Sequence, residues 1–174
     1  MSTMYNLPSG TIDSLNVIVE IPQGSSNKYE YDVETGLMKL DRANYGPTAY
    51  PVNYGFIPGT LGEDGDAYDV LLLSSYPIHP GILVEARAVA LMKMTDEGEV
   101  DDKLVCVPIK DRRWEDVKDV GDLNKHTLKE IKLFFETIKI LKGTPGTVTV
   151  HGFEDRTAAG AAFELSKKLH KEKK

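Results

Sequence analysis

The sequence predicts an α+β fold, a small β-barrel with two helices packed on it. Before residue 110 the chain is dominated by short segments rich in Val, Ile and Leu, several of which end at Pro or Gly. Turn residues cluster between these segments, most clearly at 76–81. The last third of the chain carries two stretches with apolar residues every three or four positions, which is the helical period. Many short strands followed by late helices are typical of a barrel covered by helices.

Eight segments are expected to be strands: 15–21, 28–32, 36–41, 53–57, 67–74, 82–92, 103–108 and 147–153. The second and third flank a three-residue turn and form a hairpin, so Lys28 and Arg42 share its open end. Segments 67–74 and 82–92 flank the turn at 76–81 and are interpreted as another hairpin.

The first expected helix has an apolar stripe and begins at a capping box formed by Thr127 and Glu130. Gly143 and Pro145 end it. Its stripe consists of Leu128, Ile131, Phe134, Phe135, Ile138 and Leu141. The second helix covers about 157–169, and its expected inward residues are Ala158, Ala161, Ala162, Leu165 and Leu169.

The composition of the chain excludes several classes of protein. The 174 residues suit a single domain, and 41% hydrophobic residues supply a core, which excludes a disordered acidic tail. A formal charge of −6 argues against a nucleic-acid partner. No apolar run is long enough to cross a membrane, and the first ten residues lack a secretory pattern. Cys106 is the only cysteine, so we expect a cytoplasmic protein without disulfides.

Acidic residues concentrate in two short windows, 62–69 and 96–102, which together hold nine of the 27 acids. The second expected hairpin places both windows at the same end. Crowded carboxylates repel one another unless cations neutralise them, and oxygen ligands without His or Cys favour Mg²⁺, Mn²⁺ or Ca²⁺. An EF-hand beginning at Asp64 is excluded, because its sixth and twelfth positions hold Asp69 and Ser75. A solvated acidic loop would explain Glu63 but not Asp69, which leads directly into an apolar strand.

A second cluster combines cations and phenols. Lys28 and Arg42 lie at one end of the first hairpin, and Tyr50 and Tyr54 follow shortly after it. Charge-assisted donors and hydroxyl groups are what a phosphate group requires. Tyrosines near strands are also common in cores and at their rims, so this pattern alone leaves both interpretations open.

These residues resemble the soluble inorganic pyrophosphatases. The segment Asp64-Gly65-Asp66-Ala67-Tyr68-Asp69 is similar to the family signature Asp-x-Asp-Pro-x-Asp, and further matching motifs follow in the family's order along nearly the whole chain. They are Val19–Pro22, Lys28–Glu30, Asp41-Arg42, Tyr50–Gly55, Lys93–Glu97, Asp101–Lys103 and Phe134–Glu136. The resemblance implies a twisted five-stranded OB-type barrel with two flanking helices, one catalytic domain over residues 1–174, and a homohexamer. It also implies hydrolysis of pyrophosphate to two phosphates by a metal-activated hydroxide, with Mg²⁺ as cofactor and Mn²⁺ or another divalent cation as substitute.

The resemblance further implies a role for each site residue. Asp66 would be the general base, and Glu20, Arg42 and Tyr54 would take part in catalysis. The substrate phosphates would be bound by Lys28, Arg42, Tyr54, Lys103 and Lys139. The metal ligands would be Asp64, Asp69, Asp101, Asp96 and Glu30, with Asp69 bridging two metals and Glu97 completing the acidic cavity.

Two positions depart from the family pattern. Ala67 replaces a proline of the signature, and Ile138 stands where a tyrosine usually precedes the lysine corresponding to Lys139. The second change removes one phenol donor to phosphate. Two alternatives stay open: a non-catalytic OB-type module that binds metal ions or anionic ligands, and an acidic surface for a protein partner. Asp66 distinguishes them from the enzyme, because a pure binder needs no base.

Overall fold

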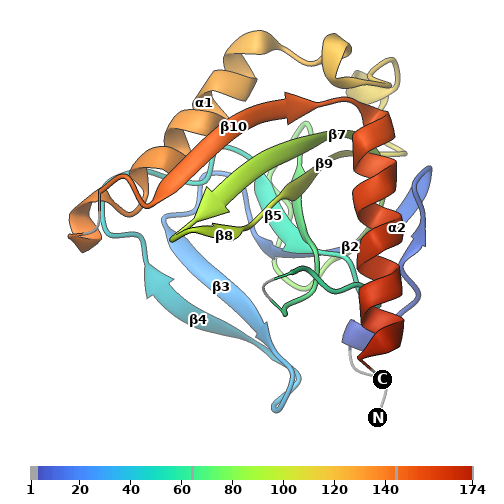
Figure 1. The fold of residues 1–174 in the computed structure, drawn as a ribbon, viewed down its shortest axis with the longest axis horizontal. Helices are drawn as coiled ribbons and strands as arrows, with labels where there is room; N and C mark the ends of the chain where they lie inside the picture. The colour runs from blue at the N-terminus through green and yellow to red at the C-terminus, as the bar shows by residue number, and fades with distance from the viewer. Residues whose placement is uncertain (1–3, 64, 144, 174) are drawn as a thin grey trace.

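The computed structural model describes residues 4–63, 65–143 and 145–173. Strands dominate the first part of the chain and α-helices the last (Figure 1). The strands are β1 Gly10–Thr11, β2 Ser14–Ile21, β3 Asn27–Asp32, β4 Leu37–Ala43, β5 Asn53–Phe56, β6 Asp69–Leu72, β7 Leu83–Asp96, β8 Glu99–Val100, β9 Lys103–Pro108 and β10 Val148–Glu154. The α-helices are α1 Lys125–Thr137 and α2 Arg156–Glu172, and the short 3-10 helices are η1 Met4–Asn6, η2 Arg112–Trp114, η3 Val120–Asp122 and η4 Ile140–Lys142.

Five strands close into a ring. Hydrogen-bonded pairs run β2–β5, β5–β6, β6–β9 and β9–β7, and a further pairing of β7 with β2 completes the circuit. Only β6–β9 is parallel; the other four pairs are antiparallel. Gly55 allows β5 to cross β2 closely, because a Cβ at this position would lie 2.0 Å from the Ile18 carbonyl oxygen. The expected five-stranded barrel is confirmed.

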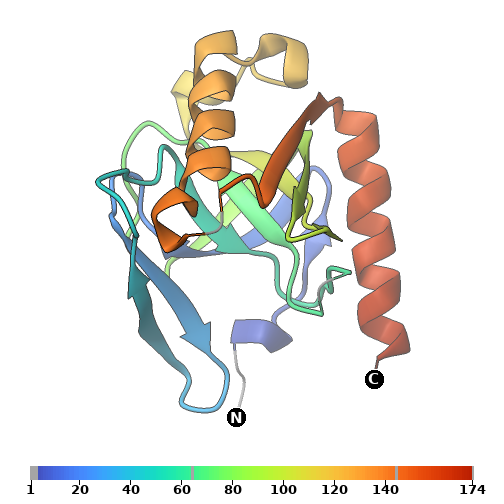
Figure 2. The ribbon, with the colours of Figure 1, turned by 60° about the vertical axis from the view of Figure 1, so that its left-hand side comes forward.

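The barrel packs a helix on each of two sides (Figure 2). One apolar cluster lies beneath α1, where Ile131, Phe134 and Phe135 pack on barrel residues. A second lies beneath α2, where Ala159 and Phe163 are fully buried. All six residues of β9 are buried, as expected for a strand covered on both faces. In the described ranges, no helix combines the length and apolar content needed to span a membrane.

The start and end of α1 differ from the prediction. The N-cap is Asn124, whose side chain accepts hydrogen bonds from the backbone of His126 and Thr127. The predicted Thr127–Glu130 capping box is therefore wrong, because Thr127 is already inside the first turn. The helix ends at Thr137, and Leu141 lies beyond it with 68% of its surface exposed.

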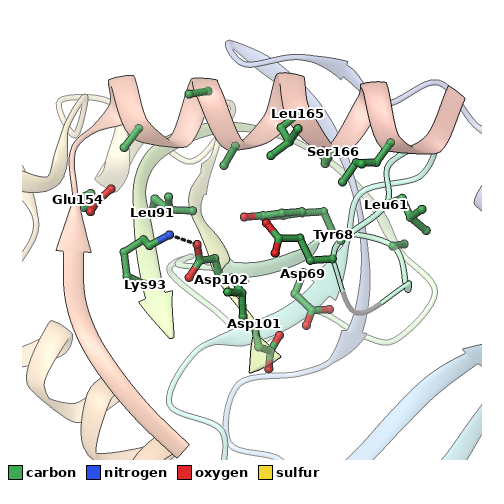
Figure 3. A pocket seen from close by; sticks show the side chains of 18 residues that line it. Leu61, Tyr68, Asp69, Leu91, Lys93, Asp101, Asp102, Glu154, Leu165 and Ser166 are labelled. Carbon is green, nitrogen blue, oxygen red and sulfur yellow. Dashed lines mark hydrogen bonds and ion pairs between the residues drawn. The ribbon is translucent and has the colours of Figure 1, made fainter. Parts of the chain in front are cut away.

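The buried face of α2 also differs from the prediction. Ala159, Phe163 and Ser166 are buried, whereas Leu165 is half exposed. Ser166 is tolerated in the core because its hydroxyl donates to the Phe163 carbonyl oxygen at 2.8 Å. The predicted stripe, from Ala158 to Leu169, instead lines an open pocket between α2 and the barrel (Figure 3).

The predicted hairpin of 67–74 with 82–92 is wrong as a pairing, because β9 lies between β6 and β7. The other predicted hairpin is confirmed: β3 and β4 form their own two-stranded sheet, which projects from the barrel (Figures 1 and 2). Lys28 pairs with Arg42 at its open end, as expected.

Candidate active site

One cavity of about 380 Å³ gathers most of the predicted site residues. It lies where the β3–β4 hairpin faces the end of the barrel. The predicted residues that line it are Glu20 on β2, Lys28 and Glu30 on β3, Tyr54 on β5, Asp66 in the following loop, Asp69 on β6 and Asp101 just before β9. Arg42, Lys103, Asp96 and Lys139 are outside this lining. Asp64 lies outside the described residues.

The parallel pairing of β6 with β9 brings the central charges together. Val70 is level with Leu104, so Asp69 and Lys103 occupy neighbouring positions at the start of the two strands. The Lys103 ammonium lies 2.7 Å from Asp69 Oδ2 and 2.7 Å from Asp101 Oδ1. The backbone of Asp101 is fixed by a hydrogen bond from its amide to the Met94 carbonyl oxygen. A single lysine therefore bridges two of the predicted metal ligands.

Burial and charge act in opposite directions on Lys103. The side chain is 2% exposed, and burial alone would lower its pKa, but the carboxylates of Asp69 and Asp101 outweigh burial and raise the pKa above its ordinary value. Lys103 is therefore a permanent cation. Its ammonium also lies 5.5 Å from the centre of the Tyr54 ring.

Tyr54 completes this cluster. Its hydroxyl donates to Asp69 Oδ2, the same oxygen that Lys103 contacts. Burial, followed by the negative charges of Asp69 and Asp101, raises the pKa of Tyr54 well above its usual value. The phenol therefore stays protonated and serves as a hydrogen-bond donor.

Glu20 is the most deeply buried of the predicted catalytic carboxyl groups that line the cavity. It is 8% exposed, and Oε1 accepts a hydrogen bond from the Tyr31 amide at 2.8 Å. Burial raises its pKa to about 8, and the neighbouring charge of Asp69 adds to this, although the Tyr31 hydrogen bond opposes it. Glu20 can therefore carry a proton near neutral pH.

The open end of the hairpin holds the other cations. Lys28 contacts Glu30 at 2.5 Å and Asp41 at 3.6 Å, and Arg42 pairs with Asp41. These side chains are partly exposed, so their ion pairs are weak and easily exchanged for another anion.

Asp96, Glu97 and Lys139 form a separate cluster. Lys139 lies 2.5 Å from Asp96 and 3.5 Å from Glu97, and Lys142 approaches Glu97 at 3.4 Å. Asp96 Oδ1 is buried, and no hydrogen-bond partner for it is found among the described residues. These residues belong to the end of β7 and the segment after α1, and they do not line the 380 Å³ cavity.

Asp102 lies in a second pocket, beneath α2. Asp102 follows Asp101 directly, but it binds Lys93 and accepts the Met94 amide at 2.9 Å, in the pocket beneath α2 (Figure 3). The acidic windows therefore do converge, as expected: Asp69 and Asp101 line both this pocket and the 380 Å³ cavity, whereas Asp102 lines only the pocket beneath α2.

The donor set fits a hard divalent cation. The cavity offers carboxylate oxygens and no His or Cys, which suits Mg²⁺ or Mn²⁺ rather than zinc or copper. The unsatisfied Oδ1 of Asp96 is a further carboxylate acceptor, but it lies outside this cavity, in the cluster with Lys139. In the part of the chain that the structure describes, no three His, Cys, Asp or Glu side chains already converge as a complete ligand set, and Lys103 lies between the two closest candidates.

Comparison with known proteins agrees with this geometry. The sequence profile of the inorganic pyrophosphatase family matches residues 17–171. The chain belongs to this family. It is 45% identical over 162 residues to the inorganic pyrophosphatase of Thermus thermophilus, covering 91% of this chain and 93% of that protein. The soluble inorganic pyrophosphatase of Zea mays is 46% identical over 155 residues, with 89% and 72% covered.

Solved structures of the family show the same fold. The crystal structure of the Thermus thermophilus inorganic pyrophosphatase superposes with a TM-score of 0.94 at 42% identity, over 98% of this chain and 99% of that one. The Helicobacter pylori inorganic pyrophosphatase gives 0.89 at 44% identity, over 95% and 98%. The resemblance inferred from the motifs is confirmed.

Sequence reasoning missed the aromatic wall of the cavity. Tyr5, Tyr31 and Phe56 line it together with the charged residues. Phe56 could have been found, because it lies two residues after Tyr54 on the same strand face. Nothing in the sequence pattern indicates that Tyr5, in η1, reaches the site.

Proposed function

We propose that this chain hydrolyses inorganic pyrophosphate to two orthophosphates and requires a divalent cation, with Mg²⁺ preferred and Mn²⁺ as a substitute. The observation that carries the proposal is the Asp69–Lys103–Asp101 bridge with the Tyr54 hydroxyl on Asp69, in a chain of this family. A non-catalytic module for metal ions or anions would not need Asp66 in the same cavity.

The proposed metal ligands are Asp64, Asp69, Asp101, Asp96 and Glu30, with Asp69 shared between two cations. When bound, the cations offset the carboxylate charge and lower the pKa of water at the site. Lys103 holds Asp69 and Asp101 close to each other, at one edge of the cavity.

The remaining groups act on water and phosphate. Asp66 accepts the proton of the attacking water as general base. Lys28, Arg42, Tyr54, Lys103 and Lys139 donate hydrogen bonds to phosphate oxygens and stabilise the charge that develops on the leaving phosphate. Glu20 lines the same cavity and takes part in catalysis from a position fixed by the hydrogen bond that it accepts from the Tyr31 amide.

The proposal also covers organisation and location. Residues 1–174 form one catalytic domain, six copies assemble into a homohexamer, and the protein works in the cytoplasm without a nucleic-acid or membrane partner. The buried, unpaired Cys106 suits a reducing compartment.

The test is phosphate release from 1 mM pyrophosphate at pH 7.5, with Mg²⁺ or with EDTA. We expect release only with the cation, and a loss of roughly a hundredfold or more in kcat for Asp66→Asn, the size expected for a general base. Asp102→Asn is the matched control, because it makes the same change at an aspartate that pairs with Lys93 and does not line the 380 Å³ cavity. Equal release in EDTA would contradict the proposal.

A further inference from the structure

The β3–β4 hairpin is held against the barrel by a hydrogen bond and by an apolar cluster. It carries Lys28, Glu30 and Arg42, yet its two strands pair with each other in a sheet of their own. Near its C-terminal end, β3 is hydrogen-bonded to the barrel through the Tyr31 amide, which donates to Glu20 on β2. The Tyr31 ring packs in a small apolar cluster with Phe56 of β5.

Tyr5 closes this cluster from outside. Its ring stacks on Phe56 with a centroid distance of 4.8 Å and an interplanar angle of 25°, and on Tyr31 at 5.7 Å and 26°. Tyr31 and Phe56 are themselves 6.2 Å apart and nearly parallel. One phenol from η1 therefore contacts both the hairpin and the barrel, beside which η1 lies in Figure 2.

The backbone fixes Tyr5 in this position. Its carbonyl oxygen accepts the Gly59 amide at 3.2 Å, and the preceding amide, of Met4, donates to the Tyr31 hydroxyl at 3.3 Å. Burial and the nearby charges of Glu20, Asp66 and Asp69 raise the pKa of Tyr5, so its hydroxyl is neutral at the acidic side of the cavity.

We propose that Tyr5 is a positioning residue of the active site: its ring, stacked between β5 and β3, sets the orientation of β3 and thereby of Lys28 on the phosphate-binding wall. The inference rests on the proposed function for its kinetic part. Its structural part, that Tyr5 sets the orientation of β3, does not depend on whether the protein is catalytically active.

The kinetic test compares Tyr5→Ala, Tyr5→Phe and Leu7→Ala. Tyr5→Ala removes the stack and is expected to raise KM for Mg²⁺-pyrophosphate about fivefold, while kcat changes less than twofold. Fivefold is the change in an equilibrium constant that corresponds to the interaction energy of one aromatic pair. Tyr5→Phe keeps the ring and is expected to restore the wild-type KM. Leu7→Ala removes apolar contact from the same cluster without a ring stack, and KM is expected to stay unchanged.

The second readout is hydrogen exchange of the Tyr31 amide in metal-free buffer, where no turnover is involved. Exchange is expected to accelerate in Tyr5→Ala and to stay slow in Tyr5→Phe and Leu7→Ala. Unchanged exchange in Tyr5→Ala, or an equal rise of KM in Leu7→Ala, would overturn the proposal. If the wild-type protein releases no phosphate, the proposed function fails, and the exchange result alone decides the role of Tyr5.

Discussion

Replacing Lys103 with methionine is expected to destabilise the metal-free protein much more than the Mg²⁺-loaded protein. Lys103 is 2% exposed, and its ammonium contacts Asp69 and Asp101 at 2.7 Å each. Methionine has a similar length and keeps the packing of the stem, but it leaves two carboxylates facing each other. Removing one partner of a buried ion pair costs about 3–5 kcal/mol. Asp69 and Asp101 are 24% and 22% exposed, so we expect the lower end, about 3 kcal/mol.

For a chain of this size, each kcal/mol shifts the melting temperature by roughly 2–4 °C, so the metal-free variant should melt about 6–12 °C below the wild type. A divalent cation bound to the same carboxylates would take over their neutralisation. Mg²⁺ at a hundred times its dissociation constant stabilises the wild-type native state by about 2.7 kcal/mol, and the variant should gain more than this, because no lysine already neutralises its carboxylates.

The assay is calorimetry of both proteins in EDTA and in 10 mM Mg²⁺. Lys93→Met is the control: Lys93 is also ion-paired, to Asp102, but it is 37% exposed and lies under α2. We expect the control to lose less than about 1 kcal/mol, the same in both buffers. An equal loss for Lys103→Met with and without Mg²⁺ would mean that cation and lysine do not share these carboxylates, and would refute the reasoning.

Two further predictions concern Glu20 and Ile138. Burial raises the pKa of folded Glu20 to about 8 from 4.5, so the folded state binds the extra proton and stability falls as pH rises from about 4.5 to 8. Glu20→Gln should remove this loss. In EDTA, its free energy of unfolding should match that of the wild type at pH 5 and exceed it by roughly 3–5 kcal/mol at pH 8.5. A variant that is less stable than the wild type at pH 8.5 would contradict the raised pKa of Glu20. Ile138→Tyr should restore a phenol donor beside Lys139 and lower KM about tenfold with little change in kcat. Because Ile138 also packs on the core beneath α1, a lower melting temperature with unchanged KM would reject that role.

The strands and the composition of the site could be predicted because they depend on local patterns. Segment 103–108 is a strand over its whole predicted length, since five apolar residues follow Lys103. The convergence of Asp69 and Asp101 was expected through a hairpin, whereas the structure achieves it through the parallel pairing of β6 with β9. Pairing partners in a closed barrel depend on contacts between distant segments, which a local pattern does not specify.

The helix faces show where local patterns are ambiguous. In α2, the stripe of Ala158, Ala162 and Leu165 and the stripe of Ala159, Phe163 and Ser166 both have helical spacing. The second is buried because Phe163 removes a larger apolar area from water and Ser166 satisfies its own hydroxyl within the helix. No sequence pattern predicts that Tyr5 lines the cavity, because its partners Tyr31 and Phe56 are far away in the sequence.

The proposed metal ligands and the proposed phosphate contacts lie mostly on different parts of the fold, the first on the barrel and the second outside it. The carboxylates Asp69 and Asp101 belong to the barrel, where strand pairing fixes their positions, and metal coordination requires such fixed geometry. Lys28 and Arg42 belong to the separate hairpin, and Lys139 follows α1. The division has exceptions: Lys103 and Tyr54 are proposed phosphate contacts on the barrel, and Glu30 is a proposed metal ligand on the hairpin. Lys103 is also held between the metal-ligand candidates Asp69 and Asp101. We therefore propose that the parts outside the barrel can carry phosphate contacts because an anion accepts hydrogen bonds from a wider range of positions than Mg²⁺ accepts ligands, with Tyr5 as one contact that would align them.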